Sequence, residues 1–289
     1  MMEKYGKVVS NVLQKNYTTY KLSGKIKKVI YPTDVLNLVE LLKYLSSNNM
    51  KYMVIGNGSN IIFMHDYDGV IIKLDNFRDV LINETKIMVG AGYDLIKLAM
   101  KTARLGLSGL EFASGIPGTI GGAVYMNAGA YNHEMSEIVK DITIIDDNFE
   151  VKKLSKKDID FGYRNSILKR KKYICISATL SLKKGDREKI LEVIKERKEK
   201  RKKTQPLNYP SAGSVFQNPS GDFAGRLIEQ AGLKGMNIND AVVSKKHANF
   251  IINKGCASGK DIKKLMFLVK KEVLKKYGIE LISEQEFIE

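Results

Sequence analysis

Short apolar runs separated by glycine-containing turns dominate the first two thirds of the chain. The runs KYMVIG, GVIIKL, KIMVGAG, ITIID and KYICISATLSL are rich in β-branched residues and predict strands. The stretches 34–49 and 94–106 instead repeat apolar residues at three- and four-residue spacing, which predicts helices. Asp34 supplies a start signal for the first helix, and Gly106 ends the second. We therefore expect mixed α and β structure over residues 1 to about 189.

The pattern changes at the charged segment GDREKILEVIKERKEKRKKTQP, residues 185–206. Ile190, Leu191 and Ile194 lie at helical spacing, and acidic residues are interleaved with the basic ones, which predicts a solvated amphipathic helix. After it, AGRLIEQAGL and GKDIKKLMFLVKKEVLKKYG predict helices, while NFIIN and the closing IELI predict strands. We therefore expect an α+β fold with a domain boundary between residues 190 and 205.

Length and composition restrict the class of protein. The 289 residues, of which 44% are hydrophobic, are enough for two domains with a proper core. No apolar run approaches the ~18 residues of a membrane span, and the N-terminal residues lack the pattern of a secretory signal. Cys175 and Cys256 lack the spacing of a metal or redox pair and fit a reducing compartment. We expect a cytoplasmic protein with no membrane partner and no metal site.

The net charge of +16 makes nucleic acid a partner to consider. The densest basic segment, 185–206, has no aromatic residues between its charges on which bases could stack. We therefore expect no nucleic-acid partner, and a positive surface that attracts anionic small molecules such as nucleotides.

Two neutral segments are crowded with glycine. They are GNGSN, Gly56–Asn60, and GIPGTIGGAVYMNAGAY, Gly115–Tyr131, which holds five glycines in seventeen residues. Each glycine inside a helix or strand costs roughly 0.5–1 kcal/mol relative to alanine, so we expect both segments to be loops. Backbone N–H groups exposed in such loops suit a diphosphate. The chain has neither a dinucleotide fingerprint nor a P-loop sequence, and for GNGSN a tight turn between strands is an equal alternative.

The chain resembles the UDP-N-acetylenolpyruvoylglucosamine reductase (MurB) family in motifs that follow one another over almost its whole length. The motifs are YTTYK (17–21), GNGSN, SGLEFASGIPGTIGGAVYMNAGAY, FGYRNSIL (161–168), PSAGSVFQNP (210–219), AGLKG (231–235) and HANFIIN (247–253). The length, with no insertion between YRNS and GSVFQNP, resembles the shorter, second type of the family.

The resemblance implies a flavoenzyme with an α+β fold. An FAD-binding domain of the vanillyl-alcohol oxidase type would occupy residues 1–195, in two subdomains divided near residue 80, and a smaller α+β substrate-binding domain would occupy 196–289. The implied reaction belongs to peptidoglycan synthesis: NADPH reduces non-covalently bound FAD, and the flavin then reduces UDP-N-acetylglucosamine enolpyruvate to UDP-N-acetylmuramate. The hydride goes to C3 of the enolpyruvyl group and a proton goes to C2.

The resemblance also assigns site residues. Arg164 would stabilise the negative charge that builds at the substrate carboxylate, Ser214 would protonate C2, and Glu284 would be the third catalytic residue. Glu286 lies nearby and competes with Glu284 for this role, and Gln285 stands in place of the family's valine. The expected substrate-binding residues are Tyr163, Gln217 and Asn218. The expected cofactor-binding residues are Gly56, Asn57, Gly58, Ser59, Asn60, Gly115, Ile116, Pro117, Gly118, Gly121, Gly122, Ala123, Asn127, Ala128 and Gly129.

Other interpretations of these motifs stay open. His247 in HANF is expected to be a structural hydrogen-bonding residue, because no carboxylate pairs with it in the motif. A flavin oxidase on the same FAD-binding fold is the alternative function, and a non-enzymatic nucleic-acid binder is a third. PSAGSVFQNP and HANFIIN favour the reductase over both, because they resemble motifs of its substrate domain.

Overall fold

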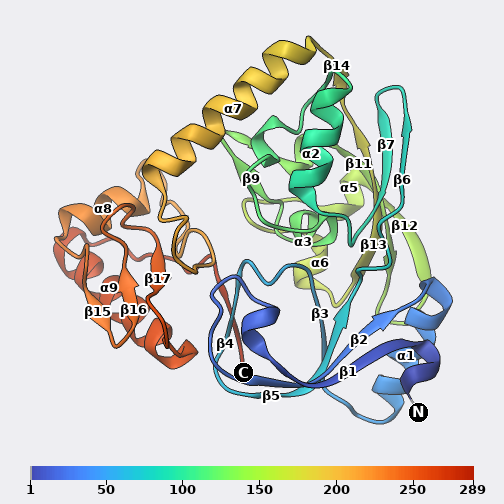
Figure 1. Ribbon diagram of the computed structural model, residues 1–289, viewed down its shortest axis with the longest axis horizontal. Coiled ribbons are helices and arrows are strands. Elements are labelled where there is room, and N and C mark those ends of the chain that lie inside the picture. The colour runs from blue at the N-terminus through green and yellow to red at the C-terminus, as the bar shows by residue number, and fades with distance from the viewer. Residues whose placement is uncertain (1) are drawn as a thin grey trace. The chain divides into compact units, whose positions relative to one another are not determined.

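The computed structural model describes residues 2–289, which form two compact units (Figure 1). Unit 1 holds the chain up to Ser10, Lys28–Asn57 and Gly69–Glu199, and unit 2 holds Asn11–Lys27, Gly58–Asp68 and Lys200–Glu289. Four elements contribute residues to both units: β1 (Gly6–Leu13), β2 (Lys25–Pro32), β5 (Tyr67–Lys73) and α7 (Arg187–Thr204). The predicted FAD-binding domain (1–195) and substrate-binding domain (196–289) are defined by function and not by compactness, and their limits stay a prediction.

Most of the other elements belong to unit 1. Its helices are the 3-10 helices Met2–Tyr5 and Glu111–Ala113, α1 (Val35–Ser47), α2 (Leu95–Arg104), α3 (Ile120–Tyr125), α4 (Met135–Ile138), α5 (Lys156–Ile159) and α6 (Ile167–Arg170). Its strands are β3 (Tyr52–Ile55), β6 (Val80–Asn83), β7 (Lys86–Gly90), β8 (Leu107–Ser108), β9 (Gly129–Ala130), β10 (His133–Glu134), β11 (Val139–Ile145), β12 (Val151–Ser155), β13 (Ile174–Ser181) and β14 (Lys183–Lys184).

A five-stranded antiparallel sheet of order β12-β11-β13-β7-β6 forms the centre of unit 1. Ala178 of β13 lies between Ile142 of β11 and Val89 of β7, and all three side chains are buried. The short helix α3 packs against β13 and β7 (Figure 1). Because α3 is the middle of the glycine-rich stretch, this packing fixes the predicted cofactor segment on the most buried part of the sheet.

The two predicted helices of unit 1 are confirmed as α1 and α2. In α1, Leu38, Leu41, Leu42 and Leu45 are all completely buried, so the three- and four-residue spacing marks the face turned to the core. The Asp34 carboxylate accepts a 2.9 Å hydrogen bond from the Asn37 N–H and caps the start of the helix. The spacing of apolar residues in the sequence was therefore sufficient to predict both helices.

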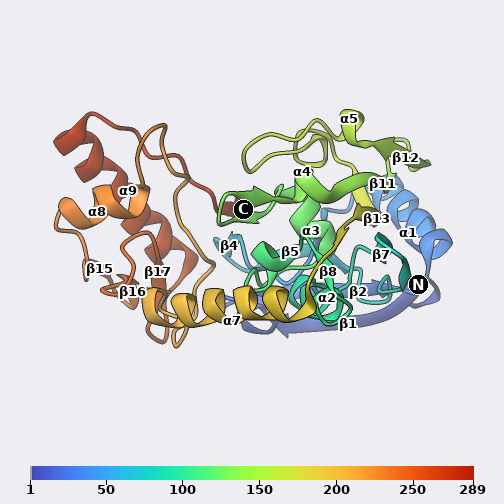
Figure 2. The same ribbon diagram turned by 90° about the horizontal axis from the view of Figure 1, so that it is seen from above.

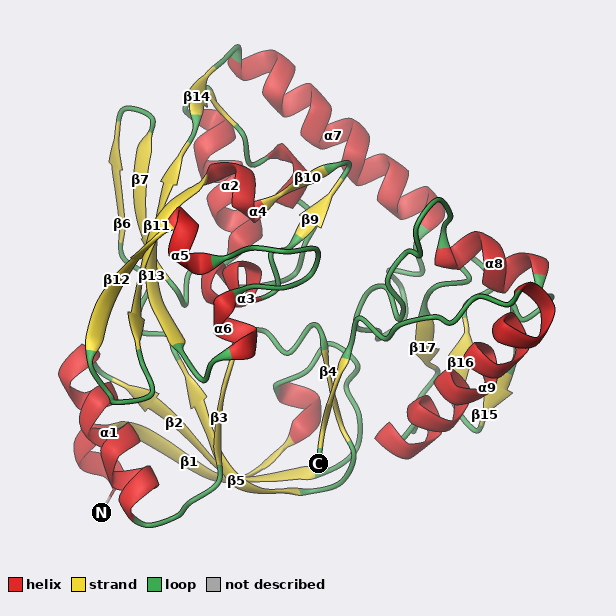
Figure 3. Ribbon diagram, turned by 180° about the vertical axis from the view of Figure 1, so that it is seen from behind, coloured by secondary structure: helices red, strands yellow, loops and turns green. Residues whose placement is uncertain are grey.

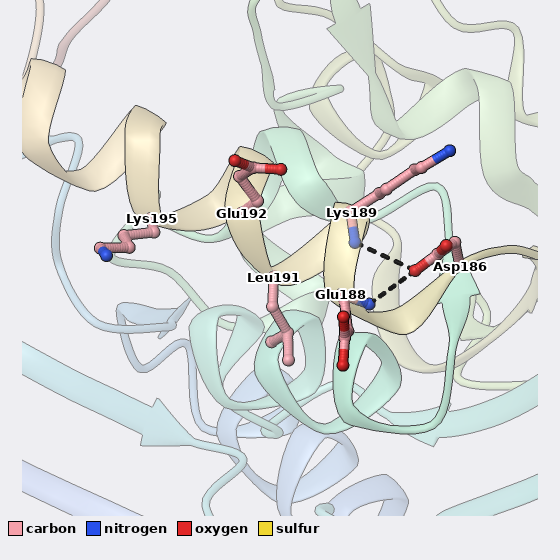
Figure 4. Close-up of a pocket in the computed structure, with 6 residues that line it drawn as sticks. All are labelled: Asp186, Glu188, Lys189, Leu191, Glu192 and Lys195. Carbon is pink, nitrogen blue, oxygen red and sulfur yellow. Dashed lines mark hydrogen bonds between the residues drawn. The ribbon is translucent and has the colours of Figure 1, made fainter.

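The charged segment forms α7, whose full length is visible in Figure 2. Ile190 and Ile194 are buried against Ala103 of α2, and Asp186 accepts hydrogen bonds from the N–H groups of Glu188 (2.9 Å) and Lys189 (3.2 Å). A shallow hollow at this end of the helix is lined by Asp186, Glu188, Lys189, Leu191, Glu192 and Lys195. In Figure 4 these side chains fan out from one helix end, so they do not converge on a ligand. The predicted solvated amphipathic helix is confirmed.

Unit 2 is built around α9 (Gly259–Tyr277), which packs against a three-stranded antiparallel sheet of order β15-β16-β17 (Figure 3). The other elements of unit 2 are the 3-10 helix Gln14–Asn16, β4 (Ile61–Phe63), α8 (Ala224–Gln230), β15 (Asn237–Ile238), β16 (Ala241–Val243), β17 (Ile251–Asn253) and β18 (Glu286–Ile288). Leu265, Met266 and Val269 of α9 are buried in the core that also contains Leu227 and Ile228 of α8. The predicted helices of this region are confirmed.

The closing strand was predicted at the wrong place. IELI, residues 279–282, forms no strand, and β18 begins only at Glu286. Burial does alternate along IELI, with Leu281 completely buried and Ile282 61% exposed, but the backbone here meets its neighbour only in an isolated bridge between Phe216 and Ser283. β18 pairs in parallel with β4, with Phe287 opposite Ile62. A distant partner in the chain, and not the local pattern, decides where this strand lies.

The expected α+β class is confirmed by these sheets and helices. The glycine-rich stretch is not a loop throughout, however, because α3 occupies its middle. The helix forms because the Thr119 side chain caps its start and because Ile120, Ala123 and Val124 are buried along one face. None of the helices formed by residues 2–289 has the length and apolar composition needed to cross a membrane.

Candidate active site

The two glycine-rich segments are neighbours in unit 1. Gly56 follows the end of β3, and a Cβ atom on it would lie only 2.6 Å from Thr119 Oγ1 at the start of α3. The Lys73 ammonium donates to the Gly56 carbonyl oxygen and so fixes the end of β3. The first residue of GNGSN therefore lies against the cap of α3, at a distance that only glycine permits.

The glycines of α3 have two different roles. A Cβ atom on Gly121 would lie 3.0 Å from Ala91 Cβ, and the Gly121 N–H donates to the Ala91 carbonyl oxygen at 2.8 Å, so Gly121 serves close packing. At Gly118, by contrast, no atom of residues 2–289 lies within 4 Å of the Cβ position, and at Gly122 only Thr119 Oγ1 does, at 3.5 Å. Gly118 and Gly122 thus leave open space beside the helix, which a ligand could fill.

Asn127 supports the end of the glycine-rich stretch. Its side chain is completely buried and its backbone has a positive φ of 43°. The amide donates to the Gly162 carbonyl oxygen at 2.9 Å and accepts from the Ser136 N–H at 2.9 Å. Because both ends of this amide bind protein groups, the side chain shapes the predicted cofactor loop from within.

Arg164 lies in a tight turn that is tied to the same stretch. The backbones of Gly162 and Asn165 form two hydrogen bonds across the turn, and Arg164 has a left-handed φ of 53°. The guanidinium donates to the Gly129 carbonyl oxygen at 3.0 Å and stacks over the Tyr163 ring at 4.9 Å. Its direction is therefore fixed at both the backbone and the side chain.

Ser166 connects this turn with α3. Its side chain is completely buried, and its hydroxyl donates to the Tyr125 carbonyl oxygen at 2.8 Å. The motif residues Arg164 and Ser166 are thus held to the glycine-rich stretch through Gly129 and Tyr125, and Tyr163 contacts Arg164. Within unit 1 the structure brings together the predicted residues Gly56, Gly118 to Gly129, Tyr163 and Arg164.

In unit 2, Ser214 lies beside Glu284. The Glu284 N–H donates to the Val215 carbonyl oxygen, and the Gln217 N–H donates to the Ile282 carbonyl oxygen, each at 2.9 Å. The segment that carries Ser214 therefore runs alongside the segment that carries Glu284. Both side chains are half-buried, and the pairing makes them neighbours although they are far apart in the sequence.

The second half of GNGSN also lies beside Glu284, in unit 2. The Asn60 amide donates to the Glu284 carbonyl oxygen at 3.0 Å, and the Glu286 N–H donates to the Asn60 carbonyl oxygen at 2.9 Å. Gly58 has a φ of 62°, and a Cβ atom there would clash with the Tyr17 carbonyl oxygen. The segment is thus a tight turn, as one interpretation of it predicted, and it also holds the backbone around Glu284.

The register separates the two competing glutamates. Glu284 pairs with Val215, next to Ser214, whereas Glu286 begins β18 and lies opposite Ile61 of β4. Asn218, predicted to bind substrate, is exposed, and its Oδ1 accepts from the Ala224 N–H at the start of α8 at 3.1 Å. The roles predicted for these residues stay predictions.

His247 makes the structural contacts expected of it. Its Nδ1 accepts from the Asn249 N–H at 3.3 Å, and its ring contacts the Phe250 ring edge-on at 4.8 Å. Burial lowers the pKa of His247, and the nearby Lys234 lowers it further. The ring is therefore neutral near pH 7.

Sequence reasoning missed three polar residues that hold the site. Lys73 ends the apolar run GVIIK, Asn249 interrupts the apolar residues of HANFIIN, and Gln285 was treated only as a departure from the family. Asn249 accepts from the Phe216 N–H and donates to its carbonyl oxygen, at 2.9 and 2.8 Å. A polar residue inside a buried apolar run was the signal that could have identified Asn249.

Comparison with known proteins identifies the family of the chain. The family model described as UDP-N-acetylenolpyruvoylglucosamine reductase, C-terminal domain, matches residues 205–288, and the model described as FAD binding domain matches residues 26–155. The UDP-N-acetylenolpyruvoylglucosamine reductase of Anoxybacillus flavithermus is 44% identical to this chain, over 98% of this chain and 95% of its own. The chain belongs to the UDP-N-acetylenolpyruvoylglucosamine reductase family.

Other members of the reductase family give the same result. The reductase of Bacillus subtilis is 41% identical over 98% of this chain and 94% of its own. The crystal structure of the reductase (MurB) from Thermus caldophilus matches with a TM-score of 0.83 and 34% identity, over 98% of this chain and 99% of that one. The expected family and α+β flavoprotein fold are confirmed, and membership in the reductase family makes the chain an FAD-dependent oxidoreductase.

Proposed function

We propose that this chain catalyses the NADPH-dependent reduction of UDP-N-acetylglucosamine enolpyruvate to UDP-N-acetylmuramate, with FAD as its resident cofactor. The relatives from Anoxybacillus flavithermus and Bacillus subtilis carry the reductase activity in their names. The observation that supports the proposal is the backbone pairing of Glu284 with Val215, which brings the chain segments that carry Ser214 and Glu284 side by side. A hydroxyl group is a suitable donor for the protonation of C2.

The open space at α3 fits the diphosphate of FAD. Gly118 and Gly122 present no side chain to it, and both lie in the segment that matches the FAD-binding family model. The Gly118 N–H already donates to Ile116 and the Gly121 N–H to Ala91, so Gly118 contributes room and Gly121 contributes packing. FAD, when bound, supplies the hydride transfer that amino-acid side chains cannot perform.

Arg164 suits the charge that develops on the substrate. Hydride addition at C3 builds negative charge at C2 and at the carboxylate, and a guanidinium placed beforehand stabilises that charge without reorganising. The hydrogen bond to the Gly129 carbonyl oxygen orients the guanidinium plane, and the Tyr163 ring supports one face of it. A planar fork held in this way matches a carboxylate in a way that a lysine ammonium cannot.

The direct test of the proposal is anaerobic. The purified flavoprotein is reduced with NADPH until its yellow colour is lost, and the enolpyruvyl nucleotide is then added. We expect the oxidised flavin spectrum to return with formation of one product per flavin. A reduced flavin that oxygen reoxidises but the enolpyruvyl nucleotide does not would favour the flavin oxidase.

Replacing Arg164 by lysine should impair the reaction severely. Arg164→Lys keeps the positive charge, but it loses the two-pronged geometry and the fixed hydrogen bond to Gly129. We expect reduction of FAD by NADPH to be near normal and reoxidation by the substrate to be slowed by on the order of 10²-fold. Stopped-flow absorbance of the two half-reactions measures both rates. Near-normal reoxidation in this variant would remove Arg164 from the catalytic residues.

A further inference from the structure

Gln285 is almost completely buried in unit 2, with 3% of its surface exposed. Its Nε2 lies 2.9 Å from the carbonyl oxygen of Ala212, 3.4 Å from that of Gly213 and 3.3 Å from that of Ser214. Its Oε1 accepts a 3.0 Å hydrogen bond from the hydroxyl of the fully buried Tyr20. We propose that Gln285 is a positioning residue that holds the Ser214 loop for proton transfer, and that Tyr20 holds Gln285 in its working orientation.

The amide of Gln285 can work in only one orientation. Three carbonyl oxygens face one of its ends, and since carbonyl groups only accept hydrogen bonds, that end must be the NH2 group. Burial raises the pKa of Tyr20 far above its usual value, so the phenol keeps its proton and donates it to Oε1. Turning the amide over would set oxygen against oxygen at the loop and leave the Tyr20 hydroxyl without an acceptor.

The Ser214 loop is anchored in the core by the buried Ala212, but it has no side-chain anchor at the turn residue Gly213 itself. Gly213 has a φ of 72°, and no atom of residues 2–289 lies within 4 Å of its Cβ position, so no side-chain packing fixes the turn there. The carbonyl groups of residues 212–214 all turn toward the two N–H donors of the Gln285 amide, which therefore stabilise this bend. Asn249 holds the loop only further along, at Val215 and Phe216.

Gln285 also connects the two proposed catalytic residues of unit 2. It directly follows Glu284, whose N–H donates to the Val215 carbonyl oxygen. The backbone of Glu284 and the side chain of Gln285 therefore hold four consecutive residues, 212–215. One dipeptide thus sets the distance between Ser214 and Glu284, and a displacement of about 1 Å in such a pair costs on the order of 10²-fold in rate.

The test uses Gln285→Met, which has a similar shape and cannot donate a hydrogen bond. This inference rests on the proposed role of Ser214 as proton donor. We expect Gln285→Met to retain FAD and to be reduced by NADPH within about twofold of the normal rate, while reoxidation by the enolpyruvyl nucleotide slows by roughly 10- to 100-fold. Tyr20→Phe, which leaves the amide donor in place, should slow reoxidation in the same direction by a smaller factor, and it serves as the test if Gln285→Met does not fold.

A double variant shows whether Gln285 acts through Ser214. Once the hydroxyl is removed in Ser214→Ala, its position no longer matters, so adding Gln285→Met should slow reoxidation by less than about twofold further. Fully additive losses, or normal reoxidation in Gln285→Met beside slow reoxidation in Ser214→Ala, would overturn this inference and leave the proposed function intact. Normal reoxidation in Ser214→Ala itself would remove Ser214 as the proton donor and overturn this inference with it, while the reductase activity would stand.

Gln14→Met is the matched control. Gln14 is likewise completely buried in unit 2, and its Nε2 donates to the carbonyl oxygens of His65 and Lys25 at 2.7 and 3.2 Å. The same chemical change there should lower the melting temperature of the protein and leave both half-reaction rates unchanged. If Gln14→Met slows reoxidation as much as Gln285→Met does, the effect is a general loosening of unit 2 and the positioning role is wrong.

Discussion

Removing the Ser214 hydroxyl should slow reoxidation of the reduced flavin by the substrate by roughly 10²- to 10⁴-fold, the usual contribution of a positioned general acid. Ser214→Ala should still bind FAD and accept hydride from NADPH at a near-normal rate, because the hydroxyl takes no part in that half-reaction. Affinity for the enolpyruvyl nucleotide should change little, since one hydroxyl hydrogen bond contributes only about 0.5–1.5 kcal/mol. Stopped-flow measurement of each half-reaction, with binding followed through the flavin spectrum, separates these quantities.

Ser214→Cys is the control for proton donation. A thiol can still donate a proton, so this variant should recover part of the loss seen in Ser214→Ala. If Ser214→Ala slows both half-reactions equally, or only raises the dissociation constant of the substrate, Ser214 is a binding or structural residue. The proton would then have to come from water or from another group on the same loop.

A side chain at Gly122 should abolish retention of FAD without unfolding the protein. Gly122→Val projects its methyl groups into the space where the Cβ position meets only Thr119 Oγ1, at 3.5 Å, so the protein itself has room for them. Valine is no worse than glycine in a helix, so α3 itself is expected to persist. The measurement is the FAD content of the purified variant together with its melting temperature, compared with the normal protein stripped of FAD.

Neighbouring substitutions make this prediction specific. Gly121→Val should lower the melting temperature, because its Cβ atom would lie 3.0 Å from Ala91 Cβ in the packed face of α3. Gly122→Ala, which adds a single methyl group, should weaken FAD binding less than Gly122→Val does. A folded Gly122→Val protein that retains stoichiometric FAD would show that the diphosphate does not occupy the open space beside Gly122.

The elements that could be predicted from the sequence are those whose burial follows their own periodicity. In α1 the four leucines at helical spacing all face the core, and in α7 Ile190 and Ile194 do the same among charged neighbours. Helix α3 was missed because its two glycines lower the local helix propensity, whereas the cap from Thr119 and the close packing against Ala91 stabilise it in the fold. The strand β18 was misplaced because its partner, β4, is distant in the sequence.

The candidate site was predictable only as far as motifs identify residues. The glycine stretches, Arg164 and Ser214 were found from the family resemblance, but no spacing in the sequence shows that Ser214 lies beside Glu284. That proximity comes from a backbone pairing between distant segments. Gln285 was beyond sequence reasoning for the same reason, since an amide becomes informative only when the three carbonyl groups around it are known.

The parallel pairing of β4 with β18 has a consequence for synthesis of the protein on the ribosome. Ile61, Ile62 and Phe63 are translated early, and their partner residues, Glu286 to Ile288, are translated about 225 residues later. At a translation rate of about 5–20 residues per second, the delay between synthesis of β4 and synthesis of β18 is roughly 11 to 45 seconds. During that interval β4 lacks the strand that pairs with it, and an apolar strand with unpaired backbone groups is a site of aggregation.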